Sequence, residues 1–198
     1  MVGCDFRGGV RLGRQFHMEP VLQFQEPHEA LRDSYRELVR EFLDAGEPLI
    51  PFPLTFPNED FPAFLARLAA ATRGEGLRPG AVPHSTFWLV SNGVVVAVAN
   101  LRHSLTDSLR REGGNIGYGV RPSARRRGFA GEILRHTLSR ARGLGLSEVL
   151  LTCAKTNVAS FRTILGQGGV FLSEEYLPDR CEVVQRYRIS LESRLGAR

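Results

Sequence analysis

The fold of this chain is decided by residues 118–130, which read YGVRPSARRRGFA. A β-rich run ends at Val120, a basic turn containing Gly128 follows, and an amphipathic stretch over residues 129–144 begins directly after it. The apolar residues of that stretch recur at helical spacing, which predicts a helix. A helix N-terminus leaves unpaired amides and a partial positive charge, so the order strand, turn, helix predicts an anion site at the turn.

The residue types in the turn suit a bound anion. Gly128 has no Cβ, so the backbone can approach the anion closely, and Ala130 is the next smallest choice. Arg125, Arg126 and Arg127 can add charge-assisted hydrogen bonds, each contributing about 1.5–3 kcal/mol. The turn lacks the Gly-Lys-Ser/Thr sequence of a P-loop and does not match GxGxxG.

Positive charge is concentrated around this turn. Residues 121–142 hold seven arginines and one acid, Glu132, while the formal net charge of all 198 residues is only +5. Lys155 is the only lysine in the sequence. The excess predicts an anionic partner, either a nucleic acid or a phosphorylated small molecule, with a solvated surface as the alternative. A nucleic acid is the less favoured partner, because no helix–turn–helix, zinc-finger or aromatic-stacking pattern accompanies the arginines.

The remaining sequence alternates between helical and β-rich segments. Apolar spacing and Gly or Pro boundaries predict further helices over residues 29–45, 61–72 and 157–165. The β-rich runs predict strands over 21–25, 86–90, 94–101, 115–120, 148–152, 170–176 and 182–189. Asn92-Gly93 predicts a hairpin turn between the second and third of these strands.

Two segments carry more specific expectations. The proline-rich residues 49–61 predict a loop whose phenylalanines either line a pocket or fill the edge of the core. The continuous apolar run over 148–152 predicts a central strand buried on both faces. The order of elements predicts an α/β fold in a single domain, with a mixed, mostly antiparallel central sheet and helices on both faces.

Composition limits the class of protein further. At 22.0 kDa the chain suits one domain, and no apolar run reaches the roughly 18–20 residues that a membrane span needs. The cysteines Cys4, Cys153 and Cys181 form neither a disulfide framework nor a zinc motif, so we expect a reducing cytoplasm and no metal. We expect residues 1–17 to be a non-essential extension and residues 18–198 to form the domain.

The motifs resemble those of a known superfamily. Arg125-x-x-Gly128-x-Ala130 after the strand resembles the Q/R-x-x-G-x-G/A acetyl-CoA signature of the GCN5-related N-acetyltransferases (GNAT). Residues 157–160 (NVAS) and 168–171 (GGVF) resemble the later motif, in which an asparagine precedes a short helix and a G-F turn. The resemblance extends over residues 21–189 and includes a bacterial branch usually labelled only as predicted acetyltransferases.

The resemblance implies a GNAT fold, acetyl-CoA as co-substrate, and acetyl transfer to a primary amine of a small molecule or protein by direct attack on the thioester. It implies pairing of pantetheine with the fourth strand, a pyrophosphate at the basic turn, and an asparagine on the pantetheine arm. The implied cofactor-binding residues are Tyr118, Val120, Arg125, Arg126, Arg127, Gly128, Phe129, Ala130, Asn157 and Ser160. Asn157 also suits a helix N-cap, and a homodimer is compatible with the sequence.

The family's usual catalytic residues are not matched. Its glutamate position falls near residues 114–115, which hold no carboxylate, and its tyrosine position holds Ile164. The candidate replacements are His103, Glu112 and Tyr118, each with a purely structural role as the alternative. Cys153 is a weaker candidate, because a small apolar residue is expected at the end of a buried strand. The unmatched positions leave open a non-catalytic acyl-CoA-binding or regulatory module.

Overall fold

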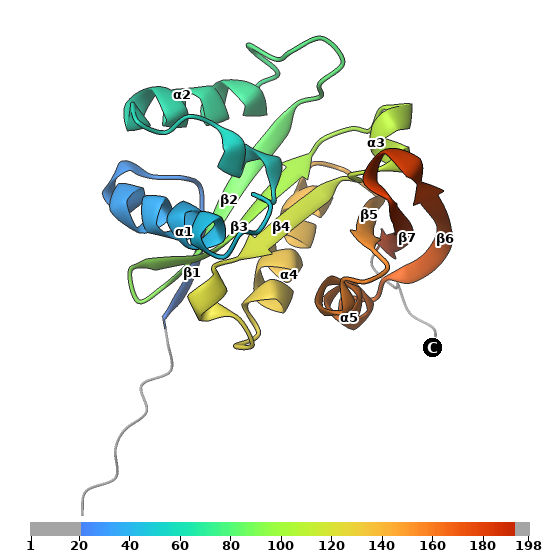
Figure 1. Ribbon diagram of the computed structural model, residues 1–198. Coiled ribbons are helices and arrows are strands. Elements are labelled where there is room, and N and C mark those ends of the chain that lie inside the picture. Colours follow the sequence, from blue (N-terminus) through green and yellow to red (C-terminus); the bar gives the residue numbers. More distant parts are fainter. Residues whose placement is uncertain (1–20, 193–198) are drawn as a thin grey trace, which may run out of the picture.

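Two antiparallel sheets lie side by side in the computed structural model, which describes residues 21–192 (Figure 1). The first sheet has the strand order β1 (Leu22–Gln25), β2 (His84–Ser91), β3 (Val94–Arg102), β4 (Ile116–Val120). The second has the order β5 (Glu148–Ala154), β7 (Glu182–Ser190), β6 (Val170–Leu177). The α/β class and the antiparallel pairing are confirmed, with two sheets in place of one. Residues 1–17 and Cys4 lie outside the described residues.

Helices cover both faces of the first sheet (Figure 1). One face carries α1 (Arg32–Asp44) and α2 (Phe61–Thr72), where Tyr35 stacks on the fully buried Trp88 with ring centroids 4.8 Å apart. The opposite face carries α4 (Phe129–Gly143), whose Ile133 packs with Leu89 and Ala97. No helix among residues 21–192 is long and apolar enough to cross a membrane.

Shorter elements complete the fold. The helix α5 (Val158–Gly166) follows β5, and the 3-10 helix η2 (Phe52–Thr55) lies in the predicted proline-rich loop. The sequence did not predict α3 (Asp107–Arg111), which Thr106 begins by accepting a hydrogen bond from the N–H of Leu109. Five residues are too few for apolar periodicity to reveal a helix.

The strand β5 is not buried on both faces, and that prediction is wrong. Val149, Leu151 and Cys153 are buried, whereas the alternate residues Leu150 and Thr152 are half-buried. The strand forms one edge of the second sheet, with β7 as its only partner within residues 21–192. The apolar sequence of β5 does not reveal that β4, the neighbouring strand of the first sheet, separates from it.

The two sheets are joined at Asn115, the residue before β4. Its N–H donates to the carbonyl of Leu150 at 2.7 Å, and its Oδ1 accepts from the N–H of Leu150 at 2.8 Å. A second link runs from the N–H of Gly113 to Thr152 Oγ1 at 3.0 Å. Within residues 21–192 no hydrogen bond joins β4 itself to β5, so the two strands separate after Asn115.

Replacing Asn115 should destabilise the junction between the sheets. In Asn115→Ala the partly buried N–H of Leu150 loses its acceptor, so we expect the free energy of unfolding to fall by about 1–3 kcal/mol. Urea denaturation followed by circular dichroism measures the change. Asn58→Ala is the control, because no hydrogen bond involves the Asn58 side chain within residues 21–192, and its effect should stay within about 0.5 kcal/mol. Equal effects of the two substitutions would contradict the assigned role.

Candidate functional site

A cavity of about 730 Å³ opens beside β4, beyond the point at which that strand leaves β5. Its walls come from β4, the basic turn, the start of α4, the first turns of α5, and the end of α1 with the loop after it. The volume falls in the range of about 300–1,000 Å³ that small-molecule and cofactor sites occupy. Nine of the ten predicted cofactor residues line it, namely Tyr118, Val120, Arg125, Arg126, Gly128, Phe129, Ala130, Asn157 and Ser160.

Arg127 is the predicted residue that does not line this cavity. Its guanidinium lies over the ring of Phe129, 5.0 Å from the centroid, and the residue borders a separate hollow with Glu37 and Asn92. Its neighbours Arg126 and Gly128 have positive φ angles of 62° and 83°. The backbone therefore turns sharply here, and consecutive side chains diverge. The sequence pattern alone does not resolve that divergence.

The turn before α4 presents free backbone amides to the cavity. Gly128 is the N-cap residue in the left-handed conformation, and no side chain caps the helix. Within residues 21–192 the N–H groups of residues 126–131 have no hydrogen-bond acceptor, and the N–H of Glu132 is the first to find one, at 3.2 Å on the Gly128 carbonyl. A Cβ at Gly128 would meet nothing within 4 Å. Open amides and the helix dipole together suit an anion.

Acids from α1 and the loop after it neutralise part of the arginine cluster. Arg121 pairs with Glu41 at 2.7 Å and with Glu37 at 3.1 Å. Arg125 forms a bidentate pair with Glu47, with N–O distances of 2.5 and 2.6 Å. Hydrogen bonds from Arg125 lower the pKa of the Glu47 carboxyl. The local charge count missed these partners because they lie far away in the sequence, so the predicted excess is partly compensated.

Tyr118 joins two walls of the cavity, and Asn157 caps the helix that forms one of them. The hydroxyl of Tyr118 on β4 is 3.0 Å from Ser160 Oγ on α5. Burial raises the pKa of Tyr118 to about 12, so the phenol keeps its proton at neutral pH and can donate a hydrogen bond. Asn157 caps α5, its side chain accepting from the N–H of Ser160 at 3.0 Å, and it also lines the cavity.

The other catalytic candidates lie elsewhere. His103 Nε2 is 2.9 Å from Ser85 Oγ, and Glu112 forms an ion pair with Arg180. Neither lines the cavity beside β4, and these two contacts are of the structural kind given as the alternative. Cys153 is buried, and burial raises the pKa of its thiol, which opposes a nucleophilic role.

Sequence reasoning missed His84, Arg102 and the cavity that they line. This second cavity, of about 600 Å³, lies beyond η2, between the end of α2 and α3. Of the phenylalanines in the proline-rich loop, Phe52 and Phe56 also line this cavity, whereas Phe61 is buried in the core, so both predicted roles occur. The pairing of β2 with β3 places His84 opposite Arg102, but that register depends on an irregularity at Leu89/Val90, for which the sequence offered no clear signal.

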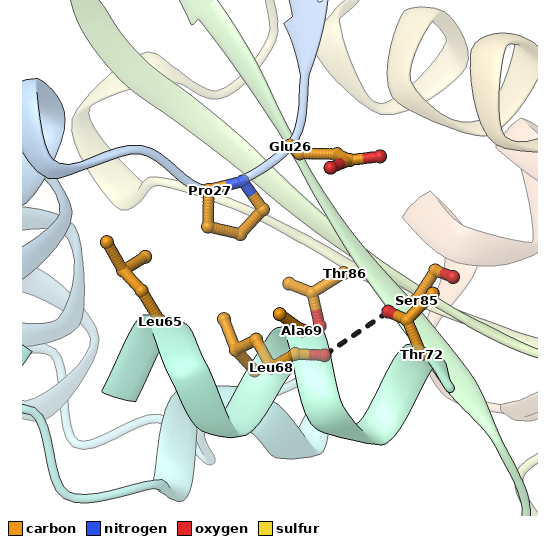
Figure 2. Close-up of a pocket in the computed structure, with 8 residues that line it drawn as sticks. All are labelled: Glu26, Pro27, Leu65, Leu68, Ala69, Thr72, Ser85 and Thr86. Atoms are coloured by element: carbon orange, nitrogen blue, oxygen red, sulfur yellow. Dashed lines mark hydrogen bonds between the residues drawn. The ribbon is translucent and has the colours of Figure 1, made fainter. Parts of the chain in front are cut away.

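A third cavity is too small for a cofactor. It lies between α2 and β2 and has a volume of about 60 Å³ (Figure 2). The hydroxyl of Thr72 donates to the carbonyl of Leu68 at 3.2 Å in its wall. Among residues 21–192 no cluster of three or more His, Cys, Asp or Glu could hold a metal ion.

Comparison with known protein families identifies the family to which this fold belongs. Residues 34–166 match the model described as the acetyltransferase (GNAT) family. No curated protein matches the chain.

Several solved structures share the fold. One is YncA of Salmonella typhimurium with its cofactor acetyl-CoA, at 15% identity and a TM-score of 0.57, covering 89% of this chain and 98% of that one. RimL, a ribosomal L7/L12 α-N-protein acetyltransferase in complex with coenzyme A, has 15% sequence identity and a TM-score of 0.63. The match covers 85% of this chain and 93% of RimL. The dodecameric spermidine N-acetyltransferase of Vibrio cholerae has 15% sequence identity and a TM-score of 0.59. The match covers 88% of this chain and 96% of that one.

The high pKa of Tyr118 should appear in a phenol titration. Subtracting the ultraviolet titration curve of Tyr118→Phe from that of the wild type should leave a component with a midpoint near pH 12, not near 10. Because the folded-state pKa lies above the unfolded one, this phenol contributes stability below pH 10 that is lost as the pH rises toward 12. A difference midpoint at the ordinary tyrosine value would show that the Tyr118 hydroxyl is solvated.

Proposed function

We propose, from the premise that this chain belongs to the acetyltransferase (GNAT) family, that the cavity beside β4 binds acetyl-CoA and that the protein acetylates a primary amine. The observation that carries the proposal is the run of unpaired amides at residues 126–131, of which all but that of Arg127 belong to residues that line a cavity of about 730 Å³. Backbone amides in a helix N-terminal turn bind phosphate oxygens well. The similar structures solved with acetyl-CoA and coenzyme A support the same cofactor class.

The cofactor would contact first the Gly128 turn and then the edge of β4 that lies away from β3. The pyrophosphate would lie on the amides of the Gly128 turn, with the exposed side chain of Arg126 beside it. The amide-bearing pantetheine arm would run along β4, whose edge away from β3 has no strand partner within residues 21–192. An unpaired strand edge offers backbone donors and acceptors in the spacing that an extended chain requires. Ser160 and Asn157 would form the opposite wall.

The transfer would proceed by direct attack of the amine. The neutral amine forms a C–N bond to the thioester carbonyl carbon, the C–S bond breaks, and coenzyme A leaves with the electron pair. The amine's surplus proton neutralises the thiolate, directly or through solvent. Tyr118 is protonated at neutral pH and lies in the cavity wall, so we assign it as the donor that stabilises the leaving sulfur. A thiol pKa near 8.5 makes this leaving group tolerable with modest assistance.

Non-catalytic acyl-CoA binding is the second candidate function. The specific observation in its favour is that Glu47, the one carboxylate among the cavity-lining residues, is held by Arg125. A lysine-like amine, with a pKa near 10.4, is neutral in only about one molecule in 2,500 at pH 7, so a free base would help. Thiol release in a screen of amines separates the two candidates, because a binding module would take up acetyl-CoA without releasing coenzyme A.

The Gly128 turn is tested by adding a side chain and a negative charge. Gly128→Glu should reduce acetyl-CoA affinity at least about 100-fold in calorimetric titration, because the carboxylate would occupy the phosphate position. Gly145→Glu is a matched control at the other end of α4. Gly145 has a φ of 82° against 83° for Gly128, an added Cβ there also meets nothing within 4 Å, and it does not line the cavity. Equal affinities of the two variants would refute the site.

Neighbouring arginines should contribute unequally. Arg126→Met should weaken acetyl-CoA binding about tenfold, the loss expected for one charge-assisted hydrogen bond. Arg127→Met should change it by less than about twofold, because Arg127 lies outside the cavity, against Phe129. Titrations at the same ionic strength provide the comparison. A larger loss from Arg127→Met would mean that the phosphates lie on the other side of the turn.

A further inference from the structure

The second cavity has aromatic walls and the size of a small-molecule site. It occupies about 600 Å³ between the end of α2, η2 and α3, over the ends of β2 and β3. Phe52 and Phe56 meet edge to face in its wall, with centroids 5.6 Å apart. The ring of His84 packs edge-on against Phe52 at 4.8 Å. A planar or apolar group would find matching surfaces here.

The charged residues that line this cavity are mostly cationic. They are Arg67, Glu75, Arg78 and Arg102. The carboxylate of Glu75 already receives two hydrogen bonds from Arg73, at 2.7 and 3.0 Å. Within residues 21–192 none of the three arginines that line the cavity has a carboxylate within 4.0 Å. The cavity lining therefore carries a net positive charge, and no carboxylate within residues 21–192 pairs with its arginines.

Arg102 and Arg67 are held in place by other groups. Arg102 Nη1 donates to the carbonyls of Gly113 and Gly114, at 3.1 and 2.9 Å, and its guanidinium lies 5.2 Å from the Phe52 ring centroid. Burial lowers the pKa of Arg102, which reflects the cost of a charge withdrawn from water. Arg67 lies 3.6 Å over the ring of Phe56. Both cations are thus positioned before any ligand arrives.

His84 adds a neutral donor to the same cavity. It is 5% exposed, and its Nδ1 lies 2.9 Å from Asn100 Nδ2, which also donates to the carbonyl of Ser85 at 3.1 Å. With the Asn100 amide in this orientation Nδ1 is the acceptor, and the neutral ring then carries its proton on Nε2, which has no acceptor within residues 21–192. Burial and the charge of Arg102 lower the pKa of His84 to about 4, so the ring is neutral at pH 7.

The two large cavities flank one short segment. Ile50 lines the cavity beside β4, and Phe52 lines the second cavity. Pro51, between them, packs over Gly117 of β4. Two residues of extended chain span at most about 7 Å, so walls of the two cavities lie within one small molecule's length of each other.

We propose that the second cavity binds the carboxylate of the acyl acceptor, which is therefore a small molecule carrying an amine, a carboxylate and an apolar or aromatic portion. This assignment rests on the proposed function. Fixed arginine edges pair with a planar carboxylate, and the Nε2–H of His84 supplies a further donor. The phenylalanine pair takes the apolar portion, and the amine extends past the Ile50–Phe52 segment toward the thioester.

The first experiment measures binding alone, with benzoate as the probe and benzamide as its uncharged match. In calorimetric titrations of the full chain carrying Gly128→Glu, which blocks the proposed phosphate site beside β4, benzoate should bind about tenfold more tightly than benzamide, and inorganic phosphate should bind no better than benzamide. Equal binding of benzoate and benzamide, or tighter binding of phosphate than of benzoate, would overturn the carboxylate assignment.

A substitution then locates the binding. Arg67→Met removes an exposed guanidinium and should weaken benzoate about fivefold, leaving benzamide unchanged. Arg40→Met on α1 removes the same charge outside both cavities and should change nothing. Equal effects of the two substitutions would place the probe elsewhere. Gly128→Glu should retain benzoate binding, so failure of the acetyl-CoA site and failure of this cavity are distinguishable.

The second experiment tests the acceptor with acetyl-CoA present. The pair para-(aminomethyl)benzoate and para-(aminomethyl)benzamide share one amine and differ only in the carboxylate. Thiol release should show kcat/KM about tenfold higher for the carboxylate, and Arg67→Met should remove the preference through KM. Equal rates for both amines would overturn the assignment, and so would no transfer to either amine by protein that binds acetyl-CoA and benzoate.

Discussion

The contact between Asn115 and Leu150 is the constraint on which the rest of the structure depends. The side chain of Asn115 substitutes for a backbone carbonyl, so one residue makes two hydrogen bonds across the seam between the sheets. Because β4 itself forms no hydrogen bonds with β5, the gap begins at a defined position. The cavity beside β4 and the hydroxyl contact of Tyr118 with Ser160 both lie beyond that position.

The function of the arginines follows from their partners more than from their number. Glu41 and Glu47 occupy Arg121 and Arg125, whereas Arg126 faces the cavity without a carboxylate partner within residues 21–192. The same principle distinguishes the second cavity, where the partners of Arg102 within residues 21–192 are carbonyl oxygens and the Phe52 ring, with no carboxylate among them. A cation that folding has already partly removed from water, and that has no carboxylate partner, attracts an anionic ligand, because part of its desolvation cost is met before the ligand binds.

The sequence predicted the features that depend on local chain geometry. The turn at Gly128 and the cap at Asn157 need only a few consecutive residues, and the structure places them in one cavity. The residues that meet in the second cavity depend instead on the register between β2 and β3. A hairpin without irregularity would place His84 opposite Leu101, but a bulge at Leu89/Val90 shifts the pairing by one residue and brings Arg102 there. Such a shift has no clear signature in one sequence.

The near absence of lysine has a chemical consequence for a protein that handles an activated acyl group. Guanidinium groups stay protonated and are poor nucleophiles, so the chain's own cationic side chains do not compete for the acyl group. The one ε-amine, on Lys155, is paired with the carboxylate of Glu174 at 2.9 Å. Charge for anion recognition is thus provided almost entirely by groups that resist modification of the protein by its own co-substrate.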